Sequence, residues 1–224
     1  MDVSTAIDSR MSCRAFLDTS IARETIVSIL ETAKRAPSGG NLQPWMVHVL
    51  TGAPLAEFVS IIRGKLRTQP MGEGAEYNVY PPNLHDPYRS RRFRCGEDLY
   101  ATINIARENK LARLQQFARN YEFFGAPVAL FFAVDRRMGA DQWADLGMFM
   151  QNIMLLAREQ GLHTCAQEAW AVWHRTVGEF LRLPAEQMLF CGMALGYRDE
   201  NAPINSLRTD RAALEEFATL RGFD

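Results

Sequence analysis

The apolar stretch VALFFAV at residues 128–134 decides the fold class of this chain. A strand with no polar residue at alternate positions is typical of a sheet that is covered on both faces. Residues 46–50 (MVHVL), 163–167 and 188–195 are predicted as further buried strands. Between them, apolar residues at helical spacing over 141–160 predict a long helix. Strands that alternate with helices indicate an α/β or α+β sheet with helices packed against it.

Further helices are predicted near both ends of the chain and between the strands. Ser20 is expected to cap a helix that ends at Ala36, because the next residue is a proline. The other helices are expected at residues 3–9, 55–66, 99–118, 172–181 and 210–220. In residues 68–98, prolines and glycines replace apolar periodicity, so this stretch is predicted to be a long irregular excursion. Such excursions often form lids or binding loops.

The excursion contains a basic run, RSRRFR at residues 89–94. One interpretation is a solvated surface that has no ligand. The other is an electrostatic attraction to an anionic substrate or to the phosphate of a cofactor. The sequence leaves both interpretations open.

The composition limits the classes of protein to which this chain can belong. Its 224 residues suggest a single domain over 1–224, with the excursion and a helical lid at about 68–125. Lys and Arg (25) nearly balance Asp and Glu (26), and the net charge of −1 excludes a strongly basic nucleic-acid binder. The longest apolar run, 126–134, is far shorter than the ~20 residues that span a bilayer, so no membrane partner is expected. The four cysteines form no C-x-x-C pair and no leader pattern is visible, so we expect a cytoplasmic protein.

Motifs for catalysis without a cofactor are missing. The sequence has no G-x-S-x-G, no Gly-rich phosphate loop and no G-x-G-x-x-G after a strand. The four histidines lack metal-ligand spacing, and His163 with Cys165 is at most a two-ligand fragment, so no metal is expected. Cys165 also lacks an obvious base that would activate it as a nucleophile. If the protein is an enzyme, a bound cofactor supplies the reactivity and no side chain is predicted to be catalytic.

Two polar clusters stand out. Arg10, Ser12 and Arg14 alternate, so in an extended segment their side chains point the same way and can bind a phosphate or another anion. The alternative is a surface stretch with accidental arginines. Residues 36–45 (APSGGNLQPW) place a hydroxyl, amides and glycine backbone between a helix and a strand. They either contact the edge of a planar heterocycle or form an ordinary tight turn.

Taken together, these clusters carry a family resemblance. The pattern R-x-S-x-R-x-F at 10–16, followed by A-P-S-x-x-N-x-Q-P-W at 36–45, resembles the opening of the nitroreductase family of FMN-dependent oxidoreductases. Residues 145–162 resemble the central dimerisation helix of that family (D-x-G-x-x-x-Q-N). Residues 191–197, followed by Pro203, Asn205 and Arg208, resemble its closing strand and phosphate-binding tail. The resemblance spans nearly the whole chain and is strongest to the branch of p-nitrobenzoate and related nitroaromatic reductases.

The resemblance implies an α+β fold of three α/β/α layers, with a mostly antiparallel central sheet, in an intertwined homodimer. It also implies that FMN lies between the two subunits. The residues implied to bind the phosphate, the ribityl chain and the pyrimidine edge of FMN are Arg10, Ser12, Arg14 and Arg208. The residues implied to reach the flavin from the partner subunit are Pro37, Ser38 and Asn41, with Gln43 nearby.

Gln167, Glu168 and Ala169 are the residues implied beside the reactive N5 of the flavin, where other members have P-x-E-G. Glu168 matches this pattern, whereas Ala166 replaces the proline and Ala169 replaces the glycine. The backbone contact to N5 is therefore the part of the family pattern from which this chain departs.

Two further expectations concern the walls of the site. Trp170 and Trp173 either line the substrate cleft or pack in the core. One more flavin contact is expected within 68–125. The polar side chains available for it are Asn109, Gln116 and Asn120.

The resemblance implies an enzyme that binds FMN and reduces nitroaromatic compounds with NAD(P)H, by ping-pong hydride transfer through the flavin N5. In this scheme Arg14 stabilises the reduced flavin near N1 and O2. Two alternatives stay open. The same FMN fold can act on another acceptor, such as a quinone, an enoate or a halophenol, or it can bind flavin without catalysis.

Overall fold

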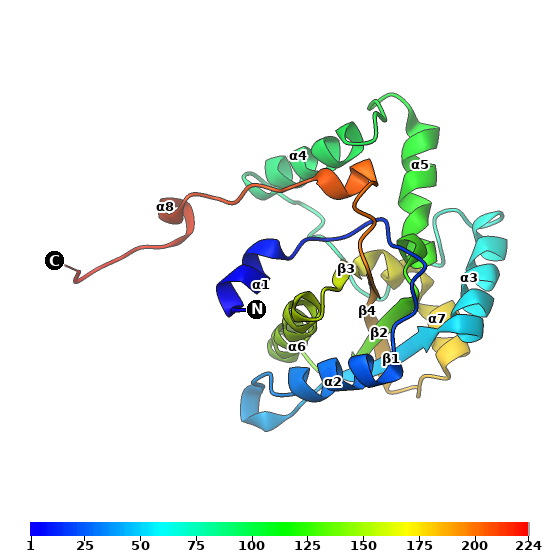
Figure 1. Ribbon diagram of the computed structural model, residues 1–224, viewed down its shortest axis with the longest axis horizontal. Helices are drawn as coiled ribbons and strands as arrows, with labels where there is room; N and C mark the ends of the chain where they lie inside the picture. The colour runs from blue at the N-terminus through cyan, green and yellow to red at the C-terminus, as the bar shows by residue number, and fades with distance from the viewer. Residues whose placement is uncertain (224) are drawn as a thin grey trace.

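The computed structural model describes residues 1–223 (Figure 1). One antiparallel sheet forms its centre. Its strands are β1 (Met46–Thr51), β2 (Val128–Asp135), β3 (His163–Gln167) and β4 (Gln187–Gly196), in the order β1-β2-β4-β3. Every neighbouring pair is antiparallel. All four predicted strands are confirmed, at nearly the predicted bounds.

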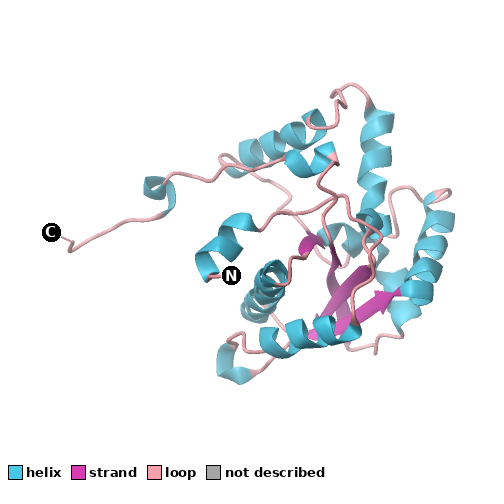
Figure 2. Cartoon of the chain, in the orientation of Figure 1, coloured by secondary structure: helices cyan, strands magenta, loops and turns pink. Residues whose placement is uncertain are grey.

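Helices surround this sheet (Figure 2). The α-helices are α1 (Val3–Ser9), α2 (Arg23–Ala33), α3 (Gly52–Leu66), α4 (Tyr88–Ala101), α5 (Lys110–Ala118), α6 (Ala140–Glu159), α7 (His174–Leu181) and α8 (Leu214–Phe217). Short 3-10 helices occupy Gly39–Asn41, Arg119–Gly125, Glu168–Trp173 and Pro203–Ser206. Within residues 1–223, no helix combines the length and the apolar character needed to cross a bilayer.

The two faces of the sheet are covered by different helices (Figure 1). Leu130 and Phe132 of β2 pack with Phe149 of α6 in one core, to which α2 also contributes. Phe131 points the other way and packs with Phe58 of α3 in a second core. Because successive side chains of a strand point to opposite faces, β2 is apolar at every position from Val128 to Val134. The three-layer α/β/α architecture of the α+β class is confirmed.

The second core consists largely of aromatic rings. Trp170 stacks on Phe123, with ring centroids 4.7 Å apart, and meets the edge of Phe131 at 5.2 Å. Tyr121 contacts both Trp170 and Trp173, and both indoles are fully buried. The interpretation of the two tryptophans as walls of a substrate cleft is therefore wrong, and their interpretation as core residues is confirmed.

The largest error in the helix predictions is α4, which lies in the stretch predicted to be irregular. None of its residues is buried, so no apolar stripe marks it in the sequence. Its first turn is stabilised by Asp86, whose Oδ1 accepts hydrogen bonds from the backbone N–H of Ser90 (3.1 Å) and from the Ser90 hydroxyl (2.6 Å). The helix predicted at 99–118 is instead the end of α4, a turn, and α5, whose first turn is capped by Asn109.

Several other helix ends also differ from the predictions. The helix predicted to end at Ala36 ends at Ala33, and α3 begins at Gly52 and not at residue 55. Ser20 caps no helix, because α2 begins three residues later and has Ala22 at its N-cap. The helix predicted at 172–181 begins at His174, after a 3-10 turn. Most of the helix predicted at 210–220 is extended chain, and only α8 is helical. Apolar spacing alone does not locate these ends: residues 169–173, just before α7, are all apolar and yet form a 3-10 helix.

Gly192 of β4 offers a test of the aromatic core. A Cβ at this position would lie 2.4 Å from Cδ1 of Trp170, whereas a Cβ at Gly64 of α3 would meet nothing within 4 Å. We predict that Gly192→Ala lowers the free energy of unfolding by about 1–3 kcal/mol, because Trp170 must move in a close-packed core. Gly64→Ala, the control, should raise it by about 0.5–1 kcal/mol through helix propensity. Urea unfolding of both variants checks this, and equal stability of the two would contradict it.

Candidate functional site

The N-terminal segment 10–16 runs along the edge of the sheet. Ser12 forms a parallel bridge with Thr164 of β3, and the Cys13 N–H donates to the Thr164 carbonyl at 2.9 Å. Met11, Cys13 and Ala15 are buried in the protein. The intervening residues are only partly buried and face a cavity. The prediction that Arg10, Ser12 and Arg14 point the same way is therefore confirmed.

That cavity has a volume of about 720 Å³ and collects arginines from both ends of the chain. The structure brings Arg10, Ser12, Arg14 and Arg208 together in it, as the sequence predicts. Its other lining residues are Ile7, Asp8, Met11, Cys95, Gln151, Leu207, Thr209 and Arg211. The sequence reasoning missed Arg211 and Gln151. The Q of the Q-N pair in the 145–162 motif is Gln151, but nothing local marks Arg211.

A buried amide holds the two chain ends beside each other. The Oδ1 of Asn205 accepts a hydrogen bond from the Arg14 N–H at 2.8 Å, and its Nδ2 donates to the carbonyls of Ala15 (2.9 Å) and Asp199 (3.0 Å). The Asn205 side chain is buried, so every polar atom of its amide is matched by a partner where water is excluded. Asn205 therefore holds Arg14 beside the C-terminal segment, which carries Arg208 and Arg211.

The cavity is strongly positive at one end. None of the arginines that line it forms an ion pair within 4.0 Å in residues 1–223, and the only lining carboxylate is that of Asp8. Burial lowers the pKa of Arg10, and the nearby guanidiniums of Arg211 and Arg208 lower it further. Guanidiniums without acidic partners, beside a hydroxyl, are the donor set that binds a phosphate or another multivalent anion.

The residues predicted beside a flavin N5 lie outside this cavity lining. Gln167 is buried, and its Nε2 donates to the Asn120 carbonyl at 2.7 Å. The side chain of Asn120 in turn donates to the Phe117 carbonyl, whereas the Oε1 of Gln167 is buried and accepts no hydrogen bond within residues 1–223. Glu168 is exposed at the end of β3, and Ala169 is half-buried.

The loop at 36–45 packs against the start of α6, away from the cavity of its own chain. The Gly39 N–H donates to Oδ2 of Asp145 at 3.2 Å, and the Gln43 N–H donates to the Ser38 hydroxyl at 3.0 Å. Pro37, Asn41 and Gln43 are exposed. None of the predicted loop residues lines the cavity that contains the arginines.

The basic run of α4 is largely occupied within the protein. Arg91 pairs with Glu216 at 2.8 Å and Arg94 pairs with Asp210 at 3.3 Å, both on the C-terminal segment. Arg92 lies 3.9 Å above the ring of Tyr80. None of these arginines lines the cavity, so the structure does not support a direct anion-binding role for the run. It instead attaches the C-terminal segment to α4.

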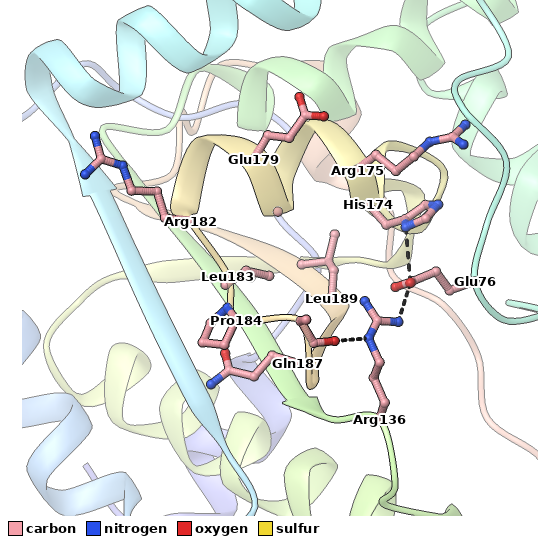
Figure 3. Close-up of a pocket in the computed structure, with 12 residues that line it drawn as sticks. Glu76, Arg136, His174, Arg175, Glu179, Arg182, Leu183, Pro184, Gln187 and Leu189 are labelled. Atoms are coloured by element: carbon pink, nitrogen blue, oxygen red, sulfur yellow. Dashed lines mark hydrogen bonds and ion pairs between the residues drawn. The ribbon is translucent and has the colours of Figure 1, made fainter.

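A second cavity, of about 420 Å³, lies between α7, the start of β4 and the excursion (Figure 3). Glu76 of the excursion pairs there with Arg136 at 2.5 Å and with His174 at 3.3 Å. Arg175 and Arg182 line this cavity too, but Glu179 adds a second carboxylate, so its lining carries charges of both signs. The first cavity has four arginines and one carboxylate, and it is therefore the candidate functional site.

Other reactive side chains near β3 are poorly suited to catalysis. Cys165 is buried, and burial raises its pKa, which disfavours the thiolate. Among residues 1–223, no three His, Cys, Asp or Glu side chains are grouped so that they could hold a metal ion.

Comparisons with known proteins bear on this site. The family model described as "Nitroreductase family" matches residues 7–197. A 4-nitrobenzoate reductase of Pseudomonas putida is 39% identical over 223 residues, which cover 100% of this chain and 97% of the relative. The solved structure of an FMN- and NADPH-dependent nitroreductase, NfnB of Sphigopyxis sp. strain HMH, superposes with a TM-score of 0.96 at 45% identity, over 100% of both chains. An FMN-dependent nitroreductase NfnB of Mycobacterium smegmatis, solved with NADPH, superposes with a TM-score of 0.92 at 26% identity, over 99% of this chain and 100% of the other.

The pKa of His163 is affected by the positive charges around the site. It is buried, and Nη1 of Arg158 lies 3.2 Å from its Nδ1, so the ring accepts a hydrogen bond in its neutral form. Burial, together with Arg158 and Arg198, lowers its pKa from 6.5 to about 4. The unfolded chain therefore binds a proton more readily than the folded one between these two values, and stability falls as the pH falls through this window.

We predict that this effect costs the wild-type protein about 2–3 kcal/mol of unfolding free energy near pH 4 relative to pH 7. In His163→Asn, whose amide oxygen can accept the Arg158 hydrogen bond, that part of the pH dependence should disappear. Urea unfolding of both proteins from pH 4 to pH 8 measures the difference. Above pH 7 the two curves should run parallel, and curves that stay parallel down to pH 4 would disprove the assignment.

Proposed function

We propose, because this chain belongs to the nitroreductase family, that it is an FMN-dependent oxidoreductase that reduces nitroaromatic compounds with NAD(P)H. The observation that carries the proposal is the set of unpaired arginines beside Ser12 in the cavity. Relatives whose names give the same activity and cofactor match along nearly the whole chain, the arginine-bearing ends included.

The residues of the cavity fit FMN. The phosphate is a dianion, and Arg10 and Arg208 supply permanent positive charge with no carboxylate partner within the described chain. The Ser12 hydroxyl lies on the same side of the segment and can bind the ribityl chain or the phosphate. Nη1 of Arg14 donates to the Ser12 carbonyl at 3.2 Å, which leaves its other N–H groups for the pyrimidine edge.

Bound FMN supplies the chemistry, which is hydride transfer through N5 from NAD(P)H to an acceptor that replaces it on the same face. The chain's own part is to bind, orient and tune. A guanidinium at position 14 would stabilise negative charge near N1 and O2 by a preorganised electrostatic contact. No acid or base side chain is required, which agrees with the poor suitability of Cys165 and the neutral state of His163.

Gln167, Glu168 and Ala169 are proposed to contact the flavin near N5. The Gln167 side chain is bonded to Asn120 on the far side of the sheet, so Gln167 would contribute through its backbone. Glu168 is exposed and free of hydrogen bonds to the described chain, so its carboxylate is available at the acceptor side. The excursion and α4 are proposed as a lid over the cavity, since α4 contributes Cys95 to its lining.

We further propose a homodimer in which Pro37, Ser38, Asn41 and Gln43 of one subunit complete the cavity of the other. Ser38 is half-buried, the other three are exposed, and all four lie away from the cavity of their own chain. The surface of a single chain is also rich in apolar groups that need cover. Met148 of α6 is 41% exposed, and Phe217 on the extended C-terminal segment is 71% exposed (Figure 1).

The activity is tested by an anaerobic titration of the purified protein. The protein should carry a flavin absorption spectrum, NAD(P)H should bleach it, and 4-nitrobenzoate should restore it, because hydride enters and leaves through one cofactor. A protein that neither carries nor takes up FMN would disprove the proposal. Restoration by quinone, enoate or halophenol but not by 4-nitrobenzoate would assign another acceptor, and flavin that NAD(P)H cannot bleach would indicate a binding protein.

Shared sites are tested by complementation. Arg10→Gln and Asn41→Asp homodimers should each bind FMN weakly; Asp is chosen because Asn41 has a φ of 57°, which short polar residues tolerate. If each site takes Arg10 from one subunit and Asn41 from the other, a heterodimer of the two variants keeps one intact site. Doubly tagged heterodimers should then bind about half the wild-type amount of FMN, as expected for a two-fold assembly. Heterodimers as defective as both homodimers would show that each site is built within one chain.

A further inference from the structure

One face of α6 holds both ends of the loop at residues 36–45. Just before the loop, Nδ2 of Asn152 donates to the carbonyl of Ala33, the last residue of α2, at 3.2 Å. At the end of the loop, the ring of Trp45 stacks on Phe149, with the centroids 4.8 Å apart and the planes 7° from parallel. Residues three and four positions apart lie on one side of a helix, so both contacts come from a single face of α6.

Asp145 lies four positions before Phe149 on the same face and holds the middle of the loop. Its Oδ2 accepts a hydrogen bond from the Gly39 N–H at 3.2 Å. Asp145 is only 6% exposed, and no Lys, Arg or His group of residues 1–223 lies within 4.0 Å of its carboxylate. A buried carboxylate is costly where no cation compensates it. Such a departure from the usual composition of a core is expected beside a functional element.

The loop conformation that these contacts hold is an uncommon one. Asn41 and Gln43 have φ values of 57° and 51°, in the left-handed region that residues other than glycine seldom occupy. Within the loop, the Gln43 N–H donates to the Ser38 hydroxyl at 3.0 Å and the Asn41 N–H donates to the Ser38 carbonyl at 2.9 Å. Backbone of this kind persists only where its surroundings fix it, and it is concentrated at sites that bind ligands.

The helix α6 also contributes to the cavity of its own chain, through Gln151. The loop lies away from that cavity, and in Figure 1 it is on the opposite side of α6 from α4, which carries the cavity residue Cys95. We infer that Asp145 is a positioning residue for the FMN site of the partner subunit, because it holds the loop that completes that site. The inference rests on the proposed function and on the proposed sharing of sites between subunits.

Substitution of Asp145 tests this role through FMN binding. Asp145→Ala in the full-length protein should raise the Kd of FMN about tenfold, as expected if only about a tenth of the loops keep the binding conformation. Asp145→Asn should stay within about twofold of the wild type, since its amide oxygen can accept the Gly39 N–H. The control is Asp141→Ala, an exposed acid one turn earlier on α6, which should change nothing. Quenching of flavin fluorescence measures each Kd. A wild-type Kd in Asp145→Ala, or an equal loss in both variants of Asp145, would overturn the inference.

Heterodimers show which site Asp145 serves. At an FMN concentration that fills wild-type sites only, Asp145→Ala paired with Arg10→Gln should bind about half the wild-type amount, because one site keeps both Arg10 and a well-placed loop. Asp145→Ala paired with Asn41→Asp should bind as little as either homodimer, because both sites then receive a defective loop. The reverse pattern would assign Asp145 to the arginine end of its own chain, and failure of both pairs would indicate a general structural defect. Either result would remove the positioning role.

Hydrogen exchange of the protein without FMN separates failure of this inference from failure of the proposed function. In Asp145→Ala the amides of 36–45 should exchange several-fold faster than in the wild type, whereas those of β2 should keep their rate. Uniformly faster exchange, or an unchanged loop, would count against the inference. If the wild type binds no FMN, the proposed function fails, and if Arg10→Gln and Asn41→Asp do not complement each other, the sharing of sites fails. If both hold while Asp145→Ala binds FMN normally, only the role of Asp145 fails.

Discussion

The amide of Asn205 is the contact on which the candidate site depends most. It joins the backbone of the N-terminal segment to the turn after β4, and it does so inside the protein, where an unmatched polar group is costly. Two backbone hydrogen bonds support the same junction, from the Asp199 N–H to the Ala15 carbonyl at 3.1 Å and from the Leu17 N–H to the Tyr197 carbonyl at 2.9 Å. The arginines approach one another although they repel, and the pKa of Arg10 is lowered first by burial and then by this repulsion. Folding therefore maintains a concentration of charge that an anion relieves, and such a ligand stabilises the fold that binds it.

The sequence predicts well those features that depend on local patterns. VALFFAV specifies a strand covered on both faces, and the alternation of Arg10, Ser12 and Arg14 places three donors on one side of an extended segment. The docking of the C-terminal segment on α4 is different, because the ion pairs that join them connect residues more than a hundred positions apart. Arg91 and Arg94 pair with Glu216 and Asp210, and no window of sequence contains both members of either pair. Trp170 was ambiguous for a related reason, since an aromatic residue after a strand suits either a cleft or a core until its neighbours are known.

The excursion after α3 contacts the helical layers on both faces of the sheet. Glu73 is bonded to Lys65 and Thr176, and Glu76 to Arg136 and His174, so acidic residues attach the start of the excursion to α3 and α7. Tyr77 then packs on the opposite face, between Trp143 and Phe190, and donates to the Phe190 carbonyl. With its first part fixed on both sides of the sheet, the excursion delivers α4 to the cavity in a defined position. The cavity in Figure 3 lies where the excursion is attached in this way.

The charge of the candidate site is nearly independent of pH in the neutral range. Its cations are arginines, which stay protonated at any pH at which proteins function. The ionisable groups of the adjoining strands are held neutral: burial, first of all, lowers the pKa of His163 to about 4, raises that of Cys13 to about 12 and raises that of Cys165. A site of this kind binds and orients a charged cofactor without offering competing protons or nucleophiles. The selectivity for one acceptor over another must then come from the shape and contacts of the acceptor side, to which Glu168, the lid and the partner subunit contribute, and not from titration of the phosphate end.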